Sequence, residues 1–279
     1  MLIKLMKYDM KSLSRAFIPM WILAPIVAML FSFSIRGMIA WENNPWLPGF
    51  MNAGNGILLA VTAVVFIGVI VGLMVMTILF IIQRFWNGLL KEEGYLMFTL
   101  PVKTWELIVS KALVATLVTC ISSVVAVFSC VVLGVFSSGE VIRTFAYMWR
   151  TFLEGVIEID LSFWVHLILL VLLGITGAVK SIYHLYAAMS MGQLFEGHRV
   201  AGSCVSYIGI SIAFSVIAGI IGIIVSYADP DFLYRGIYYN GKDLWGIFYL
   251  SYTLFLTMLQ IVIFHVISER ILATKLNLE

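Results

Sequence analysis

Six long apolar segments alternate with short polar ones along the 279-residue chain. The hydrocarbon core of a bilayer is about 30 Å thick, so an α-helix needs about 20 consecutive apolar residues to cross it. The segments that approach or exceed this length are residues 17–35, 57–82, 112–136, 161–179 with an extension to 191, 200–227 and 247–267. The pattern predicts an all-α integral membrane protein with about six transmembrane helices, forming a single domain over residues 1–279.

The composition agrees with a membrane protein and excludes two other classes. Hydrophobic residues make up 62% of the chain and charged residues 11%, whereas a soluble domain carries about 25% charged residues. The net charge of +2 is small and the basic residues are dispersed, so we expect no nucleic-acid partner. The cysteines lie inside apolar segments without the spacing of a disulfide framework or a zinc site; they are Cys120, Cys130 and Cys204.

Positively charged residues are distributed unevenly around the six segments. With the N-terminus in the cytoplasm, 12 of the 17 Lys and Arg residues lie on the cytoplasmic side. Short cytoplasmic loops of membrane proteins are enriched in Lys and Arg. We therefore expect both termini and residues 83–107 in the cytoplasm, with outer loops at residues 137–160 and 228–246.

The chain begins with an amphipathic segment, residues 1–16. Its apolar residues recur near one helical face and its basic residues lie toward the others: Leu2, Leu5, Met6 and Met10, then Lys4, Lys7, Lys11 and Arg15. This pattern predicts an interfacial helix at the headgroup level, with a solvated start to the first membrane helix as the alternative. Pro19 suits the beginning of that membrane helix, and Pro25 predicts a kink in it.

A polar stretch, "KEEGYLMFTLPVKTWEL" at residues 91–107, separates the second and third apolar segments. We expect the chain to leave the membrane from Trp86, with Gly88 and Gly94 as breaks and Pro101 as a stop. The segment between these breaks is too short to span a bilayer. Its two carboxylates precede an aromatic and apolar surface of the kind that anchors protein interfaces, so we expect it to dock onto a partner. An interfacial loop held by its aromatic residues is the alternative.

A family resemblance begins in this stretch. "EEGYLMFTLPVKTWELIVSKAL", residues 92–113, resembles the acidic-Gly-Tyr-Leu, Leu-Pro and Ser-Lys pattern of the permease subunits of ABC-2 type transporters, especially small ones from Gram-positive bacteria. Two further pieces are similar to that family, "MGQLFEGHRV" at residues 191–200 and "ILATKLNLE" at residues 271–279. With the six-helix pattern, the resemblance extends over essentially the whole chain.

The resemblance implies one half of a type V exporter in the bacterial plasma membrane. A short cytoplasmic coupling helix would insert into a cytosolic ABC ATPase, and a second permease subunit, identical or different, would complete the transporter. The coupling helix would consist of Glu92, Glu93, Gly94, Tyr95, Leu96, Met97 and Phe98, and a second cytoplasmic contact would include Gln193, Glu196, His198 and Arg199. Phe66, Met74, Met76 and Phe214 in the second and fifth segments favour an amphiphilic or hydrophobic cargo, with a core or lipid-facing position as the alternative.

The chain carries no convincing nucleotide-binding loop. The nearest match, "GIYYNGKD" at residues 236–243, ends in Asp243 where a phosphate loop needs Ser or Thr for magnesium. We therefore expect ATP and Mg²⁺ to bind a separate subunit, and we expect no cofactor on this chain. No catalytic residue is expected either, because the histidines are scattered without a hydrolase or metalloprotease motif. They are His166, His184, His198 and His265.

One polar group within the apolar segments is a candidate site, the set Lys180, Tyr183 and His184. Charged residues inside membrane helices often mark transport pathways, so these three side chains would line an inner vestibule. The alternative is that Lys180 lies near the cytoplasmic end of its helix and snorkels there, or caps against Glu196. Two other functions stay open, namely an ion-coupled carrier that uses Lys180, His184 and His265, and a noncatalytic anchor or immunity protein.

Small residues predict where membrane helices approach closely. Gly68 and Gly72 form a GxxxG pair, and two further glycine pairs lie at residues 174 and 177 and at residues 219 and 222. Glycine lets two helix backbones come together because it has no side chain. We expect contacts at these pairs, within the chain or with a second permease subunit.

Overall fold

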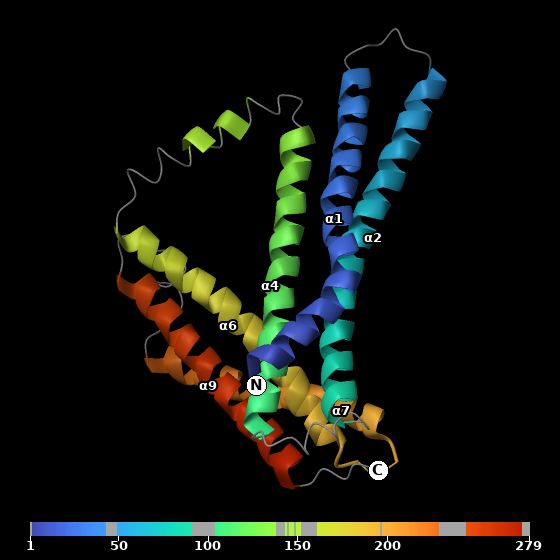
Figure 1. Cartoon of the computed structure of the whole chain (residues 1–279). Helices are drawn as coiled ribbons and strands as arrows, with labels where there is room; N and C mark the ends of the chain where they lie inside the picture. The colour runs from blue at the N-terminus through green and yellow to red at the C-terminus, as the bar shows by residue number, and fades with distance from the viewer. Residues whose placement is uncertain are drawn as a thin grey trace. The chain divides into compact units, whose positions relative to one another are not determined.

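The computed structural model describes residues 2–42, 49–90, 104–137, 143, 145–147, 149–151, 161–195, 197–228 and 244–274. These residues are helical except in the turn at residues 193–195, 197 and 198, and they include no strand. The elements are α1 (Leu2–Glu42), α2 (Gly49–Phe85), the π-helix η1 (Trp86–Leu90), α4 (Thr104–Ser137), α6 (Leu161–Gly192), α7 (Arg199–Ala228) and α9 (Leu244–Thr274), as Figure 1 shows.

Six helices in the described part of the chain are long and apolar enough to cross a membrane. The qualifying stretches are Phe17–Ile39, Gly54–Leu90, Thr104–Ser137, Phe163–Gly192, Arg199–Ala228 and Gly246–Thr274. The predicted number of transmembrane helices is therefore confirmed by length and composition. Most stretches extend beyond the predicted apolar segments because regular helix continues into the flanking polar residues.

The chain divides into two compact units, and the boundary falls within α2 and α4. The first unit contains essentially residues 3–80 and 117–158 and is built from α1, most of α2 and most of α4 (Figure 1). Buried hydroxyl groups join these helices. The indole Nε1 of Trp21 donates a hydrogen bond of 3.1 Å to Ser122 Oγ, and Thr77 Oγ1 lies 3.4 Å from the same oxygen. The ring of Phe17 packs edge-on against Phe80 at 5.6 Å.

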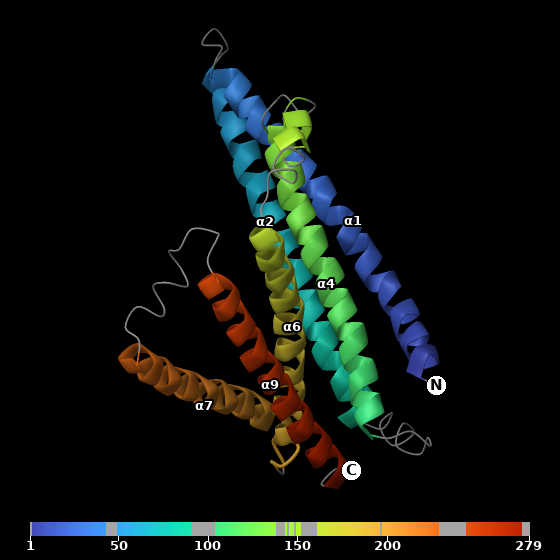
Figure 2. The ribbon, with the colours of Figure 1, turned by 90° about the vertical axis from the view of Figure 1, so that its left-hand side faces the viewer.

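The second unit contains essentially residues 81–116 and 159–279. It combines the end of α2, η1 and the first turns of α4 with α6, α7 and α9. Within it, α6 packs on both α7 and α9, and the three helices meet near the C-terminal ends of α6 and α9 and diverge from there (Figure 2). Its core contains side chains from α2, η1, α4, α6, α7 and α9.

Three local expectations from the sequence need correction or remain predictions. Pro19 does not begin a helix, since α1 is one α-helix from Leu2 to Glu42 with Pro19 and Pro25 inside it. The N-terminal part of α1 is inclined to the remainder (Figure 1), and its interfacial position stays a prediction. Gly88 does not break the helix, because the chain continues from Phe85 through η1 without interruption.

Candidate functional site

The π-helix η1 is the point where α2 enters the core of the second unit. A π-helical turn contains an extra residue and is found frequently at functional sites. Gly88, Leu89 and Leu90 are all buried, and the leucines pack in one cluster with Leu107 and Ile108 from the beginning of α4. The residues on both sides of segment 91–103 thus share one core.

Tyr186 of α6 lies at the centre of this core. Its ring stacks on Phe85 with centroids 4.1 Å apart and an interplanar angle of 20°, and both side chains are 0% exposed. The Tyr186 hydroxyl is buried and has no hydrogen-bond partner in the structure described here. Tyr183 packs edge-on against Tyr186 at 6.0 Å, so one turn of α6 presents two aromatic rings to the core.

A buried lysine lies against η1. Lys111 of α4 is only 1% exposed. A Cβ atom at Gly88 would lie 3.0 Å from Lys111 Nζ and 3.3 Å from its Cε. Gly88 therefore makes room for the lysine side chain, and the glycine that was expected to break the helix acts in packing.

The turn between α6 and α7 is closely packed on itself. A Cβ atom at Gly192 would collide with Ser203 Oγ and would lie 2.6 Å from the Ser203 backbone nitrogen. A Cβ atom at Gly202 would lie 2.6 Å from Cδ2 of Phe195. Gly197 has a φ angle of +86°, a conformation that favours glycine. These contacts fix the end of α6 on the beginning of α7.

His184 joins α6, α7 and α9 through ring contacts. Its imidazole stacks on Tyr207 of α7 at 4.3 Å and 16° and on Phe264 of α9 at 5.1 Å and 14°. Phe264 in turn packs edge-on against Phe214 of α7 at 5.0 Å. His184 Nε2 is buried without a hydrogen-bond partner among the residues that the structure describes. The ring of His184 thus packs against both neighbouring helices.

The predicted inner polar patch stays a prediction, with Lys180 and His184 one turn apart on α6. Tyr183 is 7% exposed and packs edge-on against the His265 ring at 5.4 Å, while His184 lies between Tyr207 and Phe264. Beyond Lys180, α6 continues for about three more turns to Gly192, and the predicted contact of Lys180 with Glu196 lies outside the described residues. His265 Nε2 lies 3.9 Å from Glu269 Oε2 in the next turn of α9.

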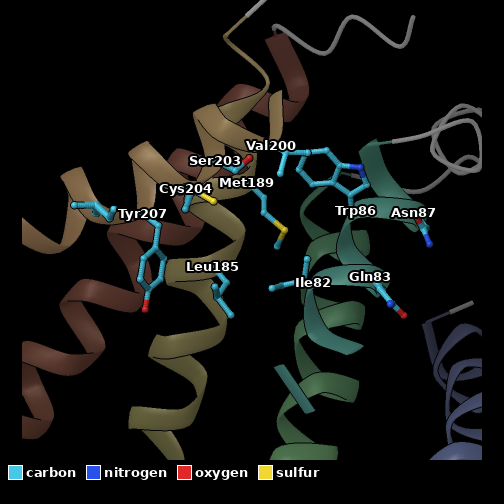
Figure 3. Close-up of a pocket in the computed structure, with 12 residues that line it drawn as sticks. Ile82, Gln83, Trp86, Asn87, Leu185, Met189, Val200, Ser203, Cys204 and Tyr207 are labelled. Atoms are coloured by element: carbon cyan, nitrogen blue, oxygen red, sulfur yellow. The ribbon is translucent and has the colours of Figure 1, made fainter. Parts of the chain in front are cut away.

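A cavity of about 630 Å³ opens between α2, η1, α6 and α7, and we call it the inner pocket (Figure 3). Its lining is mainly apolar. Ile82 and Trp86 face the side chains of α6 and α7, whereas Gln83 and Asn87 point away from them at the margin (Figure 3). The opposite side is formed by Leu185, Met189, Val200, Ser203, Cys204 and Tyr207, among others.

A second cavity of about 400 Å³ lies between α7 and α9, and we call it the α7–α9 pocket. It is lined by Phe214, Ala218 and Val225 of α7 and by Tyr249 and Leu256 of α9, among others. Among the described residues that line either pocket there is no Asp, Glu, Lys, Arg or His. Both pockets are therefore suited to uncharged, apolar groups.

Several predicted site residues lie outside the described part of the chain. They are Glu92, Glu93, Gly94, Tyr95, Leu96, Met97 and Phe98 of the coupling segment, together with Glu196 and residues 236–243. Of the second cytoplasmic contact, Gln193 is half-buried in the turn, His198 is exposed, and Arg199 begins α7. No group of three or more possible metal ligands occurs among the described residues.

Most of the predicted glycine pairs make no close contact with the residues that the structure describes. A Cβ atom at Gly68, Gly174, Gly177, Gly219 or Gly222 would have nothing within 4 Å, and only Gly72 lies near another helix, with its Cβ position 3.6 Å from Met20 Cε. Of the residues expected to line the cargo path, Phe214 lines a pocket, whereas Phe66 stacks on Phe31 and Met74 is 58% exposed. The sequence does not identify Lys111, Tyr186 or Tyr207 as site residues. Their neighbours in the sequence are typical of ordinary surface or core positions.

Comparison of the chain with protein-family models, with curated proteins and with solved structures finds no match.

Proposed function

We propose that the chain is the permease subunit of an ATP-driven ABC-2 type exporter that moves an amphiphilic or hydrophobic cargo out of a bacterial cell. Separate cytosolic subunits bind ATP and Mg²⁺, and a second permease subunit, identical or different, completes the transporter. Support comes from the six apolar helices and from the motif at residues 92–113. Both termini lie in the cytoplasm in this proposal, as the distribution of Lys and Arg predicts.

The proposal depends on the way in which segment 91–103 is anchored at both ends. Leu89 and Leu90 precede it, Leu107 and Ile108 follow it, and all four are between 0% and 6% exposed in one core. Because protein cores are close-packed, a displacement of either flank would also displace this core or its helices. A coupling element needs flanks of this kind.

The coupling segment is connected to the inner pocket by a single π-helical turn. Trp86 lines the pocket, while Leu89 and Leu90 of the same turn pack in the core. An ATPase that binds residues 92–98 differently in its ATP-bound and ATP-free states would bias the position of this turn, as any ligand-driven shift requires. A change in the position of this turn would widen or narrow the inner pocket on its α2 side.

Co-purification tests the docking role of the segment. The chain would be expressed with the ABC ATPase encoded next to its gene and purified in mild detergent, and ATP hydrolysis would be measured on the complex. The double variant Glu92→Lys, Glu93→Lys should lose the ATPase subunit, because like charges at the interface oppose binding.

The matched control reverses two carboxylates in a predicted outer loop, Glu154→Lys and Glu158→Lys. This control should retain the complex. Equal amounts of ATPase on the wild type and on the Glu92/Glu93 variant would contradict the docking role, and a wild-type chain that binds no ATPase would contradict the exporter.

Gly88→Leu separates docking from coupling. The leucine would displace Lys111 and change the packing of η1, while residues 92–98 keep their sequence. We expect the variant to retain the ATPase subunit and to lose the stimulation of ATP hydrolysis by cargo. Full stimulation in this variant would show that η1 does not transmit the signal.

No specific contact favours the two alternative functions. His184 lies between two aromatic rings and His265 lies next to Glu269, and no hydrogen bond or ion pair among the described residues joins them to Lys180. An ion-coupled carrier is therefore not proposed as a second function.

A further inference from the structure

The two pockets lie on one stripe of α7. Ser203 and Tyr207 line the inner pocket, and Phe214, Ala218 and Val225 line the α7–α9 pocket. Steps of four, seven and eleven residues return to the same face of an α-helix, because the helix turns about 100° per residue. The two cavities therefore follow each other along a single face of this helix.

A row of ring contacts links a residue of one pocket to a residue of the other. Tyr207 belongs to the wall of the inner pocket and Phe214 to the wall of the α7–α9 pocket. Between them, Tyr207 stacks on His184, His184 stacks on Phe264, and Phe264 packs against Phe214. Tyr207 and Phe214 are about 10 Å apart along the helix axis. These four side chains form a row of ring contacts between the two pocket walls.

We propose that this face of α7, from Val200 to Val225, is a path for the alkyl chain of a lipid-like amphiphile. The inner pocket and the α7–α9 pocket are two successive binding positions on this path, and the ring contacts centred on His184 are the barrier between them. The proposal names the cargo class of the exporter, and only the direction of movement rests on the proposed function.

The chemistry of the lining selects an alkyl chain. Among the residues that the structure describes, no charged side chain lines either pocket, so an ionised group would be buried there without a partner. The volumes of about 630 and 400 Å³ fall in the range of small-molecule sites, which is about 300–1,000 Å³. Two cavities that follow each other along one helix face suit a flexible, extended group better than a rigid compact one.

Access from the bilayer follows from exposure at the pocket margins. Ile208 of the inner pocket is 57% exposed and Ile217 of the α7–α9 pocket is 50% exposed. Both residues lie in a helix that is long and apolar enough to cross a membrane. An amphiphile can therefore enter sideways with its polar head kept at the headgroup level.

Photolabelling of the purified chain tests the path without any ATPase. The chain in phosphatidylcholine nanodiscs would be irradiated with a palmitic acid analogue that carries a diazirine in its alkyl chain, and adducts would be located by mass spectrometry of peptides. Excess palmitate should abolish adducts at the pocket residues of α6, α7 and α9. Adducts at Val61 and Val64, which are 54% and 70% exposed on α2, should remain.

Adducts at the pockets that persist with excess palmitate, as at Val61 and Val64, would show ordinary contact with bilayer lipid and would overturn the proposal. Cys204→Trp fills the inner pocket and should abolish the palmitate-sensitive adducts near Leu185 and Met189. The matched control is Cys130→Trp, because Cys130 is also an exposed cysteine but lines neither pocket. Retention of these adducts in monodisperse Cys204→Trp protein would contradict the site.

The barrier has its own test. His184→Ala should increase palmitate-sensitive labelling in the α7–α9 pocket relative to the inner pocket, and His184→Phe should restore the wild-type ratio by replacing the ring. An unchanged ratio in His184→Ala would overturn the barrier. Because all these measurements use the chain alone, a failed photolabelling experiment leaves the ATPase-docking result unaffected, and a failed docking experiment leaves the photolabelling result unaffected.

Discussion

Phe85 and Tyr186 stack with their ring centroids 4.1 Å apart, and the two rings join the end of α2 to α6 in the core of the second unit. Phe85→Ala should reduce the free energy of unfolding by about 3 kcal/mol, the low end of the range for such core changes, because hydrocarbon surroundings remove part of the transfer term. Tyr186→Phe should leave stability unchanged or raise it slightly, since the hydroxyl is buried without a hydrogen-bond partner in the described structure. Thermal unfolding in detergent measures the stability of both variants. A large loss of stability in Tyr186→Phe would contradict the view that the Tyr186 hydroxyl makes no stabilising hydrogen bond.

Ser122 should stabilise the first unit through its hydrogen bond with Trp21. Ser122→Ala removes the oxygen that accepts from the Trp21 indole and lies 3.4 Å from Thr77 Oγ1, and hydrogen bonds between membrane helices are worth about 0.6–2 kcal/mol each. We expect a loss of stability in this range. Ser123→Ala is the matched control, because Ser123 Oγ donates only to Thr119 O of its own helix. Equal effects of the two substitutions would mean that the helix-to-helix bond contributes nothing.

Gly192 should not tolerate a side chain, because a Cβ atom would collide with Ser203. Gly192→Ala would force α6 and α7 apart at their turn, and overpacking of this kind typically costs about 1–3 kcal/mol. Gly177→Ala in the same helix has nothing within 4 Å of its Cβ position and should be neutral or stabilising by up to about 1 kcal/mol. The unfolding temperature should fall for Gly192→Ala and should stay the same or rise for Gly177→Ala.

Lys111 should be protected from chemical modification, since it is 1% exposed. Acetylation of the purified chain with acetic anhydride, followed by peptide mass spectrometry, should leave Lys111 largely unmodified. Gly88→Leu should increase its modification, because the larger side chain takes the space of the lysine Nζ and Cε atoms. Gly134→Leu is a control, because nothing lies within 4 Å of that Cβ position. Rapid acetylation of Lys111 in the wild type would contradict its burial.

His184 should act through its ring and not through a proton. His184→Phe keeps a flat ring between Tyr207 and Phe264 and should retain stability, whereas His184→Ala loses two ring contacts worth about 0.5–1.5 kcal/mol each. Transport measured in proteoliposomes should survive in His184→Phe. If the phenylalanine variant folds normally but loses a proton-dependent transport activity, the ion-coupled carrier becomes the better explanation.

The helices could be predicted from the sequence because a membrane helix needs only a sufficient length of apolar residues. The contacts between helices could not. Gly68 and Gly177 have the residue type and spacing of a close helix contact, but the spacing does not say which face of a helix meets a neighbour. Gly192 and Gly202, which do make close contacts, lie at a turn where no periodic pattern identifies them.

The contacts in the candidate site could not be predicted from the sequence either. His184 was singled out from the sequence as a polar residue in a membrane helix, yet its role depends on Tyr207 and Phe264, which belong to two other helices. Trp86 and Gly88 were expected outside the membrane helix because glycine normally interrupts regular structure. The burial of Leu89 and Leu90 and the space that Lys111 needs favour a continuous helix here, and these are tertiary effects.

The π-helical turn η1 would let α2 shift by one residue relative to Leu89 and Leu90 without unwinding. Trp86 faces a cavity and Leu89 faces the core from a turn that holds one residue more than an α-helix would. If this turn tightened into an α-helix, every residue before it would rotate by about 100° relative to the leucines, since that is the angle per residue of an α-helix. Such a rotation would remove the indole from the cavity wall while Leu89 and Leu90 stayed packed. A screw motion of one residue, with no helix unwound, would therefore be enough to change the shape of the cavity.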